Sequence, residues 1–313
     1  FLGALISLER AVGLGRWWTF AAPLLAASGG LSLALGSLSA LPRWALTLAS
    51  AVFVLVTARI WRIQPALSNA VMGCGAVCWL VGNVLWTHGA AVPPIVLWWL
   101  GFLLLTIVGE RIELTRFQKP HPASRPWLWT ALATLGAGLL LGHAHARVGG
   151  VLTGAAVMAL AAWLGRFDLA WRTVRQPGLP RFMALCLLSG YAWLLASGAL
   201  IVWRWPQSSG VWYDAALHAF FVGFVFSMIF GHAPIILPAI LGGAVTLLRQ
   251  FYLPLAVLHA SLTIRVIADL AGLVALRRWG GLLNVVALLM YAAVMIYAVR
   301  QARYTARSDG GRS

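Results

Sequence analysis

The sequence predicts an all-α protein, a polytopic bundle of transmembrane helices. Hydrophobic residues make up 61% of the 313 residues and charged residues only 10%, with a mean hydropathy of +0.87, whereas a soluble protein contains about 25% charged residues. Apolar runs of the length that crosses a bilayer core recur along the chain, and its 17 tryptophans suit the preference of indole rings for the membrane interface. No segment keeps the alternating pattern of a β-barrel strand, so helices are expected throughout.

Ten apolar segments are candidates to cross the membrane, with prolines and glycines at most of their boundaries. We expect these helices at residues 18–36, 44–61, 67–86, 92–109, 127–142, 149–165, 182–202, 212–239, 251–272 and 281–299. The first eight residues are also apolar but too few to span, so we expect them to be the end of a truncated N-terminal helix. The chain is therefore predicted to be a single integral membrane domain, residues 1–313, with 300–313 as a tail.

The net charge of +16 lies in short loops between apolar runs, so we interpret it as a topology signal. Seventeen of the 23 basic residues fall in alternate loops and the C-terminal tail, five fall in the other loops, and Arg265 lies within a helix. Basic loops remain in the cytoplasm, which predicts a bacterial inner-membrane protein with a cytoplasmic C-terminus. The lipid bilayer is the expected partner, and no nucleic acid is expected.

Two histidines in the segment 212–239 are the strongest candidates for chemistry, because ionisable groups inside a membrane are costly. His218 and His232 are 14 residues apart, which places them about 21 Å apart along a helix and within about 40° of one face. This spacing is typical of a helix that ligates two stacked haems, and Gly223 between them would let a flat ring approach the backbone. No second helix carries such a pair, so other ligands must come from elsewhere. We expect His259 at the depth of His232.

Three further histidines, His88, His143 and His145, fall in loops on the outer side, at the predicted depth of His218. Neutral imidazole is the commonest protein ligand for haem iron and copper, so His218 with these three is a candidate metal-ligand set. The alternative for each is structural, because a histidine at a helix end can simply bond a neighbouring carbonyl.

Charged residues near these histidines have supporting roles in this interpretation. Asp214 precedes His218 by one helical turn and could fix its tautomer. Arg265 and Asp269 are four residues apart and are expected to pair, which reduces the cost of burying each. The pair is either a structural clasp or a guanidinium that binds a haem propionate.

Two short segments carry a family resemblance. The sequences DAALHAFFVG at 214–223 and LHASLTIRV at 258–266 resemble the NnrS-type membrane proteins, and the opening GALISLERAV resembles the end of a first helix in related membrane proteins. The specific residues cover about 50 positions, although helix count and hydropathy agree over most of the chain. The chain departs from the family where the apolar HAPIILP follows at 232–238.

The resemblance implies a multi-helix bacterial inner-membrane protein that binds haem and copper and is linked to nitric oxide metabolism. It implies that His218 is a ligand and that Arg265 is a family-like helix residue. Our expectation is a haem-binding protein, with copper as a further candidate, that meets a small gaseous or redox ligand in nitric oxide or respiratory metabolism. Whether it is an enzyme stays open.

The alternative is a cofactor-free transporter or permease-like protein. The histidines and the Arg265–Asp269 pair would then line a polar path through the bundle. Internal symmetry between groups of helices would favour this alternative, and the sequence shows no convincing repeat.

Overall fold

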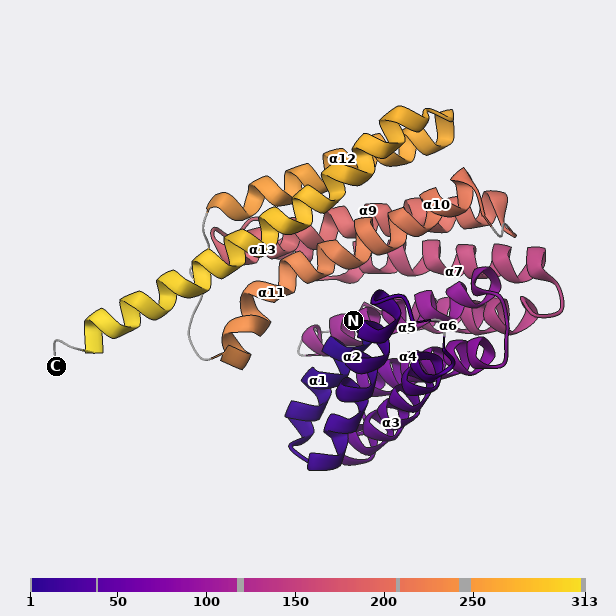
Figure 1. Ribbon diagram of the computed structural model, residues 1–313, viewed down its shortest axis with the longest axis horizontal. Helices are drawn as coiled ribbons and strands as arrows, with labels where there is room; N and C mark the ends of the chain where they lie inside the picture. The colour runs from indigo at the N-terminus through magenta and orange to yellow at the C-terminus, as the bar shows by residue number, and fades with distance from the viewer. Residues whose placement is uncertain (1, 38, 117–120, 207–208, 242–248, 311–313) are drawn as a thin grey trace. The chain divides into compact units, whose positions relative to one another are not determined.

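The computed structural model describes residues 2–37, 39–116, 121–206, 209–241 and 249–310 (Figure 1). All regular structure in these ranges is helical, which confirms the predicted all-α membrane bundle. Each of the ten expected spans coincides with a helix or a run of helices. The loop residue Lys119 and the terminal Arg312, both counted among the cytoplasmic charges, lie outside the described residues.

Within the described ranges, eight helices are long and apolar enough to cross a membrane, which supports a multi-pass membrane protein. They cover Leu41–Ile63, Leu67–Thr87, Val92–Leu114, Ala146–Phe167, Leu179–Arg204, Val211–Ile236, Arg249–Ala271 and Val274–Gln301. The other two expected spans are also helical, as α2 (Ala21–Ala34) and α6 (Ser124–Leu141). At 1.5 Å per residue α2 is about 21 Å long and α6 about 27 Å, so both are shorter than a typical hydrocarbon core.

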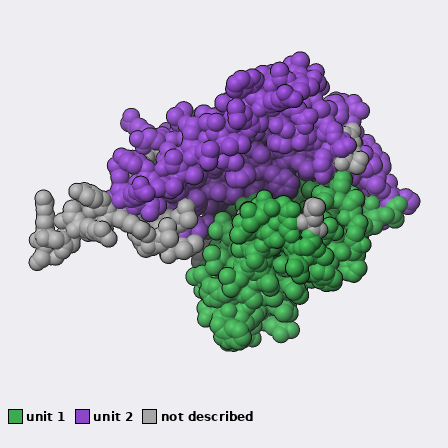
Figure 2. Space-filling model, in the orientation of Figure 1, with its two compact units in different colours: residues 1–119, 142–144 green, residues 120–141, 145–313 purple. Residues whose placement is uncertain are grey.

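The helices form two compact units, residues 1–119 with 142–144 and residues 120–141 with 145–313 (Figure 2). Unit 1 contains α1 (Leu2–Leu14), η1 (Trp17–Phe20), α2, α3 (Leu41–Ile63), α4 (Leu67–Thr87) and α5 (Val92–Leu114). Helix α5 is buried along most of its length. It lies close to α4, where Gly75 approaches the carbonyl of Phe102 and the rings of Trp79 and Phe102 stack at 4.9 Å.

Unit 2 holds the remaining helices. They are α6, α7 (Ala146–Phe167), α8 (Ala170–Thr173), α9 (Leu179–Arg204), α10 (Val211–His218), the π-helix η2 (Ala219–Val225), α11 (Phe226–Leu241), η3 (Arg249–Phe251), α12 (Tyr252–Ala271) and α13 (Val274–Gly310). The expected span 212–239 is thus a helix with a π-helical middle, and π-helical turns are frequent at functional sites.

Glycines set the close approaches within unit 2. The run α10–η2–α11 packs antiparallel to α9, with Gly190 against Met228 and Gly223 against Trp193. Helices α12 and α13 form a hairpin that turns at Gly272, whose φ of +69° is a left-handed conformation suited to glycine at a helix C-terminus. Helix α13 continues to Gly310, so the expected tail is helical up to that residue.

Candidate functional site

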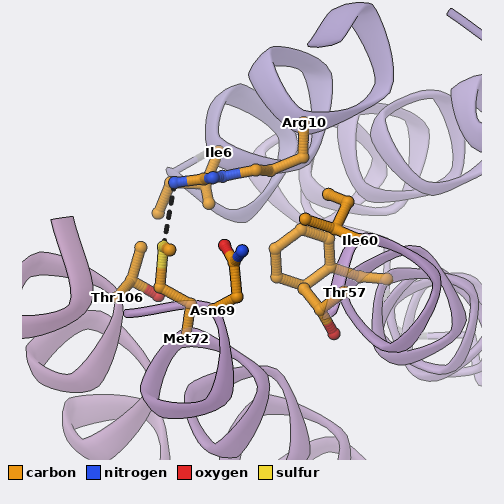
Figure 3. Close-up of a pocket in the computed structure, with 8 residues that line it drawn as sticks. Ile6, Arg10, Thr57, Ile60, Asn69, Met72 and Thr106 are labelled. Atoms are coloured by element: carbon orange, nitrogen blue, oxygen red, sulfur yellow. Dashed lines mark hydrogen bonds between the residues drawn. The ribbon is translucent and has the colours of Figure 1, made fainter. Parts of the chain in front are cut away.

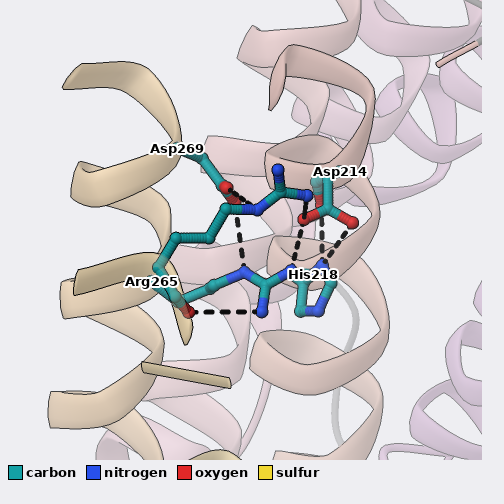
Figure 4. A network of polar contacts seen from close by, with 5 residues as sticks. Asp214, His218, Arg265 and Asp269 are labelled. Carbon is teal, nitrogen blue, oxygen red and sulfur yellow. Dashed lines mark hydrogen bonds and ion pairs between the residues drawn. The ribbon is translucent and has the colours of Figure 1, made fainter. Parts of the chain in front are cut away.

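Four charged residues from three helices of unit 2 form one ion network (Figure 4). Asp214 on α10 accepts hydrogen bonds at Oδ2 from Arg265 Nη2 of α12 at 2.5 Å and from Arg277 Nη2 of α13 at 2.9 Å. Asp269 on α12 has Arg265 Nε 3.4 Å from Oδ2 and Arg277 Nε 2.8 Å from Oδ1. The expected Arg265–Asp269 pair is therefore present, as part of a larger network that links α10, α12 and α13.

Two glycines of α13 leave the space in which Arg265 lies. A Cβ on Gly280 would come within 2.8 Å of the Arg265 backbone, and a Cβ on Gly281 within 2.5 Å of Arg265 Nη1. Contacts this short do not occur with real side chains, so the glycine pair is what lets α13 pass this closely over the arginine.

The ring of His218 is held by its own helix. Its Nδ1 lies 2.9 Å from the backbone carbonyl of Asp214 and 3.4 Å from the carboxylate oxygen Oδ1. Because a carbonyl only accepts, Nδ1 carries the proton and the neutral ring keeps its lone pair on Nε2. The predicted role of Asp214, fixing the tautomer of His218, is thus performed mainly by its backbone carbonyl, because its carboxylate oxygen Oδ2 is engaged by two arginines. Among the described residues, Nε2 has no hydrogen-bond partner.

His218 lines an open groove of about 530 Å³ between the α10–η2 segment and the α12–α13 hairpin. This volume is within the range of small-molecule sites, about 300–1,000 Å³. Its lining is mostly apolar, with four polar side chains. The lining residues are His218, Val222, Arg265, Arg278, Gly281, Leu282, Asn284, Val285 and Leu288.

The groove also contains a buried amide with unused donors. Asn284 is only 5% exposed, and its Oδ1 accepts a hydrogen bond from Ser261 Oγ at 2.6 Å. The other end of the amide, Nδ2, has no hydrogen-bond partner among the described residues. A buried donor without a partner costs about 1–3 kcal/mol, so this position calls for an explanation.

His259 lies apart from these groove residues. Its Nδ1 accepts a hydrogen bond from Trp193 Nε1 at 3.0 Å, so Nε2 carries the proton and neither nitrogen offers a free lone pair to a metal. The Trp193 indole packs on Gly223, where a Cβ would come within 2.4 Å of Cγ. The flat ring expected beside Gly223 is therefore the protein's own tryptophan, and His259 lies at the level of Gly223 rather than of His232.

The other candidate histidines have local bonds. Nδ1 of His232 lies 2.7 Å from the Met228 carbonyl, and Nδ1 of His88 lies 2.8 Å from the Val84 carbonyl.

The two histidines of the 143–145 loop are exposed, and His143 accepts a hydrogen bond from a tryptophan of α5 at 3.1 Å. His88 and His143 belong to unit 1, whereas His145 and His218 belong to unit 2. Across the described ranges, no three His, Cys, Asp or Glu side chains are grouped so as to hold a metal ion. The expected metal set of four histidines is thus divided between the two units.

Unit 1 contains a much smaller cavity, beside Arg10 (Figure 3). Arg10 Nη2 lies 2.9 Å from the sulfur of Met72 and 3.6 Å from a carboxylate oxygen of Glu110. The volume of about 10 Å³ suits at most a single water molecule. The groove of unit 2 is therefore the better candidate for a ligand.

Sequence reasoning missed the polar residues of α13 that line the groove or join the ion network. Arg277 and Arg278 were interpreted only as loop charges, although both lie on a helix and Arg277 joins the ion network. Asn284 received no role. The available signal was the neighbouring Gly280-Gly281 pair, which marks a close helix approach; no spacing rule relates Asn284 to His218.

No curated protein and no solved structure matches this chain. One family model matches, over residues 1–300, and its description is a domain of unknown function, DUF8744. Because the match covers nearly the whole chain, this protein belongs to the DUF8744 family.

Proposed function

We propose that the protein binds haem in the membrane, and that His218 would hold the iron. The observation that carries this proposal is the position of His218 in the groove. Its Nδ1 is bonded to the Asp214 carbonyl, which leaves the Nε2 lone pair for a metal. The groove around it is large enough for a cofactor. Iron bound there would supply redox chemistry and an open position for a gaseous ligand.

The charge of the groove and of the adjoining ion network supports an acidic cofactor. Arg265, Arg277 and Arg278 carry three positive charges, against two negative charges on Asp214 and Asp269. The excess of one positive charge favours a ligand with carboxylates, such as the two propionates of haem. The guanidinium of Arg265 already bonds Asp214, so we propose that Arg265 attracts a propionate through this overall positive charge rather than through a pair of its own.

The depth of the ion network favours a cofactor over transport. Asp214 is the fourth residue of α10 and Asp269 the third from the end of α12, so both lie about 5 Å or less from a helix end. Transporter sites lie near the bilayer midplane. An ion network near one membrane surface suits a redox cofactor that meets a small ligand from that side.

Copper does not form part of this proposal, because the described histidines offer no group of three ligands. The NnrS-like segments 214–223 and 258–266 include His218 and Arg265, two residues that line the groove. We therefore propose a role in nitric oxide or respiratory redox metabolism. The basic loops support a bacterial inner membrane with the C-terminus in the cytoplasm, which places the groove near the periplasmic surface.

An absorbance spectrum of the purified full chain, expressed with haem supply, tests the proposal. We expect a Soret band that shifts on reduction with dithionite and is lost in His218→Ala. His145→Ala, which removes an exposed histidine of the same unit, should leave the spectrum unchanged. Nitric oxide added to the reduced protein should shift the Soret band again.

A colourless protein in both the wild type and the His145→Ala control would overturn the haem proposal. A cofactor-free transporter would then be the better interpretation of the groove and the ion network. A Soret band that survives in His218→Ala would move the haem to another site and separate the cofactor from this groove.

A further inference from the structure

We propose that the groove of unit 2 is specific for an apolar carboxylic acid, whose acidic group lies at Arg278 and whose body is held by the Asn284 amide. This inference rests on the proposed function only in that both assign a ligand to the same groove. It would hold for any acid of this chemical class, with or without a metal.

Arg278 is the arginine of the groove whose charge is not already neutralised. Asp214 is engaged by Arg265 and Arg277, and Asp269 is engaged by the same two arginines. Arg278 has no ion-pair partner in the part of the chain that the structure describes, and it lines the groove. Its guanidinium is therefore free to take a carboxylate with charge-assisted hydrogen bonds.

The groove residues that follow Arg278 along α13 include an apolar stripe. Gly281, Leu282, Val285 and Leu288 follow it at intervals of three, four, seven and ten residues, so all lie near one face of α13. Arg278 is at the end of this stripe nearest the start of the helix. An elongated ligand with one acidic end fits this order of polar and apolar side chains.

Asn284 independently indicates that the groove receives a ligand. It is six residues after Arg278, about 9 Å further along the helix. Its oxygen is held by Ser261 and its Nδ2 donors are buried without an acceptor. A polar atom in the body of the ligand would supply that acceptor and remove the penalty of an unpaired donor.

Metal-free protoporphyrin IX and its dimethyl ester are suitable probes, because they share one apolar body and differ only in their carboxylates. Binding is measured to the full chain in nanodiscs of phosphatidylcholine, with empty nanodiscs as the blank. We expect the wild type to bind the diacid about tenfold more tightly than the diester, the effect of one charge-assisted hydrogen bond. Oleate should be preferred over methyl oleate in the same way.

Variants separate the two parts of the site. Arg278→Gln should abolish the preference for the acids, and Arg278→Lys should keep most of it. Arg300→Gln removes a positive charge elsewhere on the same helix and should change nothing. Asn284→Leu should weaken the diacid and the diester by the same factor, since both retain the body of the ligand.

The iron-free probes distinguish failure of this inference from failure of the haem proposal. A wild type that prefers the acids but shows no Soret band would support this inference and overturn the haem proposal. Equal binding of acids and esters by the wild type would overturn the inference. Displacement of both acids by phosphatidylglycerol at low mole fraction would also overturn it, because the groove would then be a site for acidic lipid.

Discussion

The carboxylate of Asp269 is fully buried and faces two arginines from different helices. Removing one partner from a buried ion network leaves an uncompensated charge and costs about 3–5 kcal/mol. We expect Asp269→Asn to lower the free energy of unfolding by about 3 kcal/mol, visible as a lower thermal transition in detergent.

Glu113→Gln provides the matched control at a more exposed pair. Glu113 bonds Arg116 and the Ser68 hydroxyl with its side chain 33% exposed, and exposed pairs contribute about 0–1 kcal/mol. Equal losses for the two variants would show that the network in unit 2 is no more important to stability than a surface pair.

The contrast between Arg265–Asp269 and Arg265–Asp214 shows how much of the site the sequence could reveal. The first pair is four residues apart on one helix, so the helical repeat alone predicts it. The second joins residues 51 positions apart, and its formation depends on how α10 packs against the hairpin. His218 was found because a polar residue in an apolar run is easily recognised. The role of Asn284 depends on how α13 packs against α12, and the sequence alone does not indicate that packing.

Among the elements, the π-helix η2 packs closely against its neighbours at one glycine. Gly223 lies in η2, where Trp193 of α9 and Leu262 of α12 meet the backbone. A methyl group at this position must displace the indole and strain its hydrogen bond to His259. We expect Gly223→Ala to destabilise the protein by about 1–3 kcal/mol, the usual cost of overpacking, measured by thermal unfolding.

Gly136→Ala is the control for this prediction. Gly136 lies within α6 and no atom lies within 4 Å of a Cβ built there. Alanine favours helix over glycine, so this variant should be neutral or more stable by up to about 1 kcal/mol. If Gly223→Ala behaves like Gly136→Ala, the close approach of Trp193 is not needed for stability.

The helices themselves were largely predictable, because ten apolar runs with Pro and Gly boundaries translate directly into helices. The π-helix η2 within the span 212–239 could not be predicted, because α- and π-helical turns share the same apolar composition. The length of α13 was also not predicted. The basic residues after 300 were interpreted as a tail, whereas the helix continues to Gly310.

At the scale of the whole molecule, the charges distinguish two topologies. With ten crossings, the Lys and Arg residues other than Arg265 divide seventeen to five between the two sides. If α2 and α6 do not cross, the same residues divide only twelve to ten. The twelve would be Arg10, Arg16, Arg43, Arg166, Arg172, Arg175, Arg181, Arg249, Arg300, Arg303, Arg307 and Arg312. Membrane proteins keep a strong bias, which favours ten crossings despite the short lengths of α2 and α6.

Reporter fusions after Gln64 and after Gly178 test this prediction. Ten crossings place both positions on the cytoplasmic side, whereas eight crossings place them on opposite sides, because α6 lies between them and no longer reverses the chain. We expect alkaline phosphatase to be inactive at both sites and a fluorescent protein to be bright at both. A fusion after Gly89 should show the reverse pattern and serves as the outer control. Activity of alkaline phosphatase at only one of Gln64 and Gly178 would show that α6 does not cross the membrane, and the reporter at Gly178 would then decide on which side the groove opens.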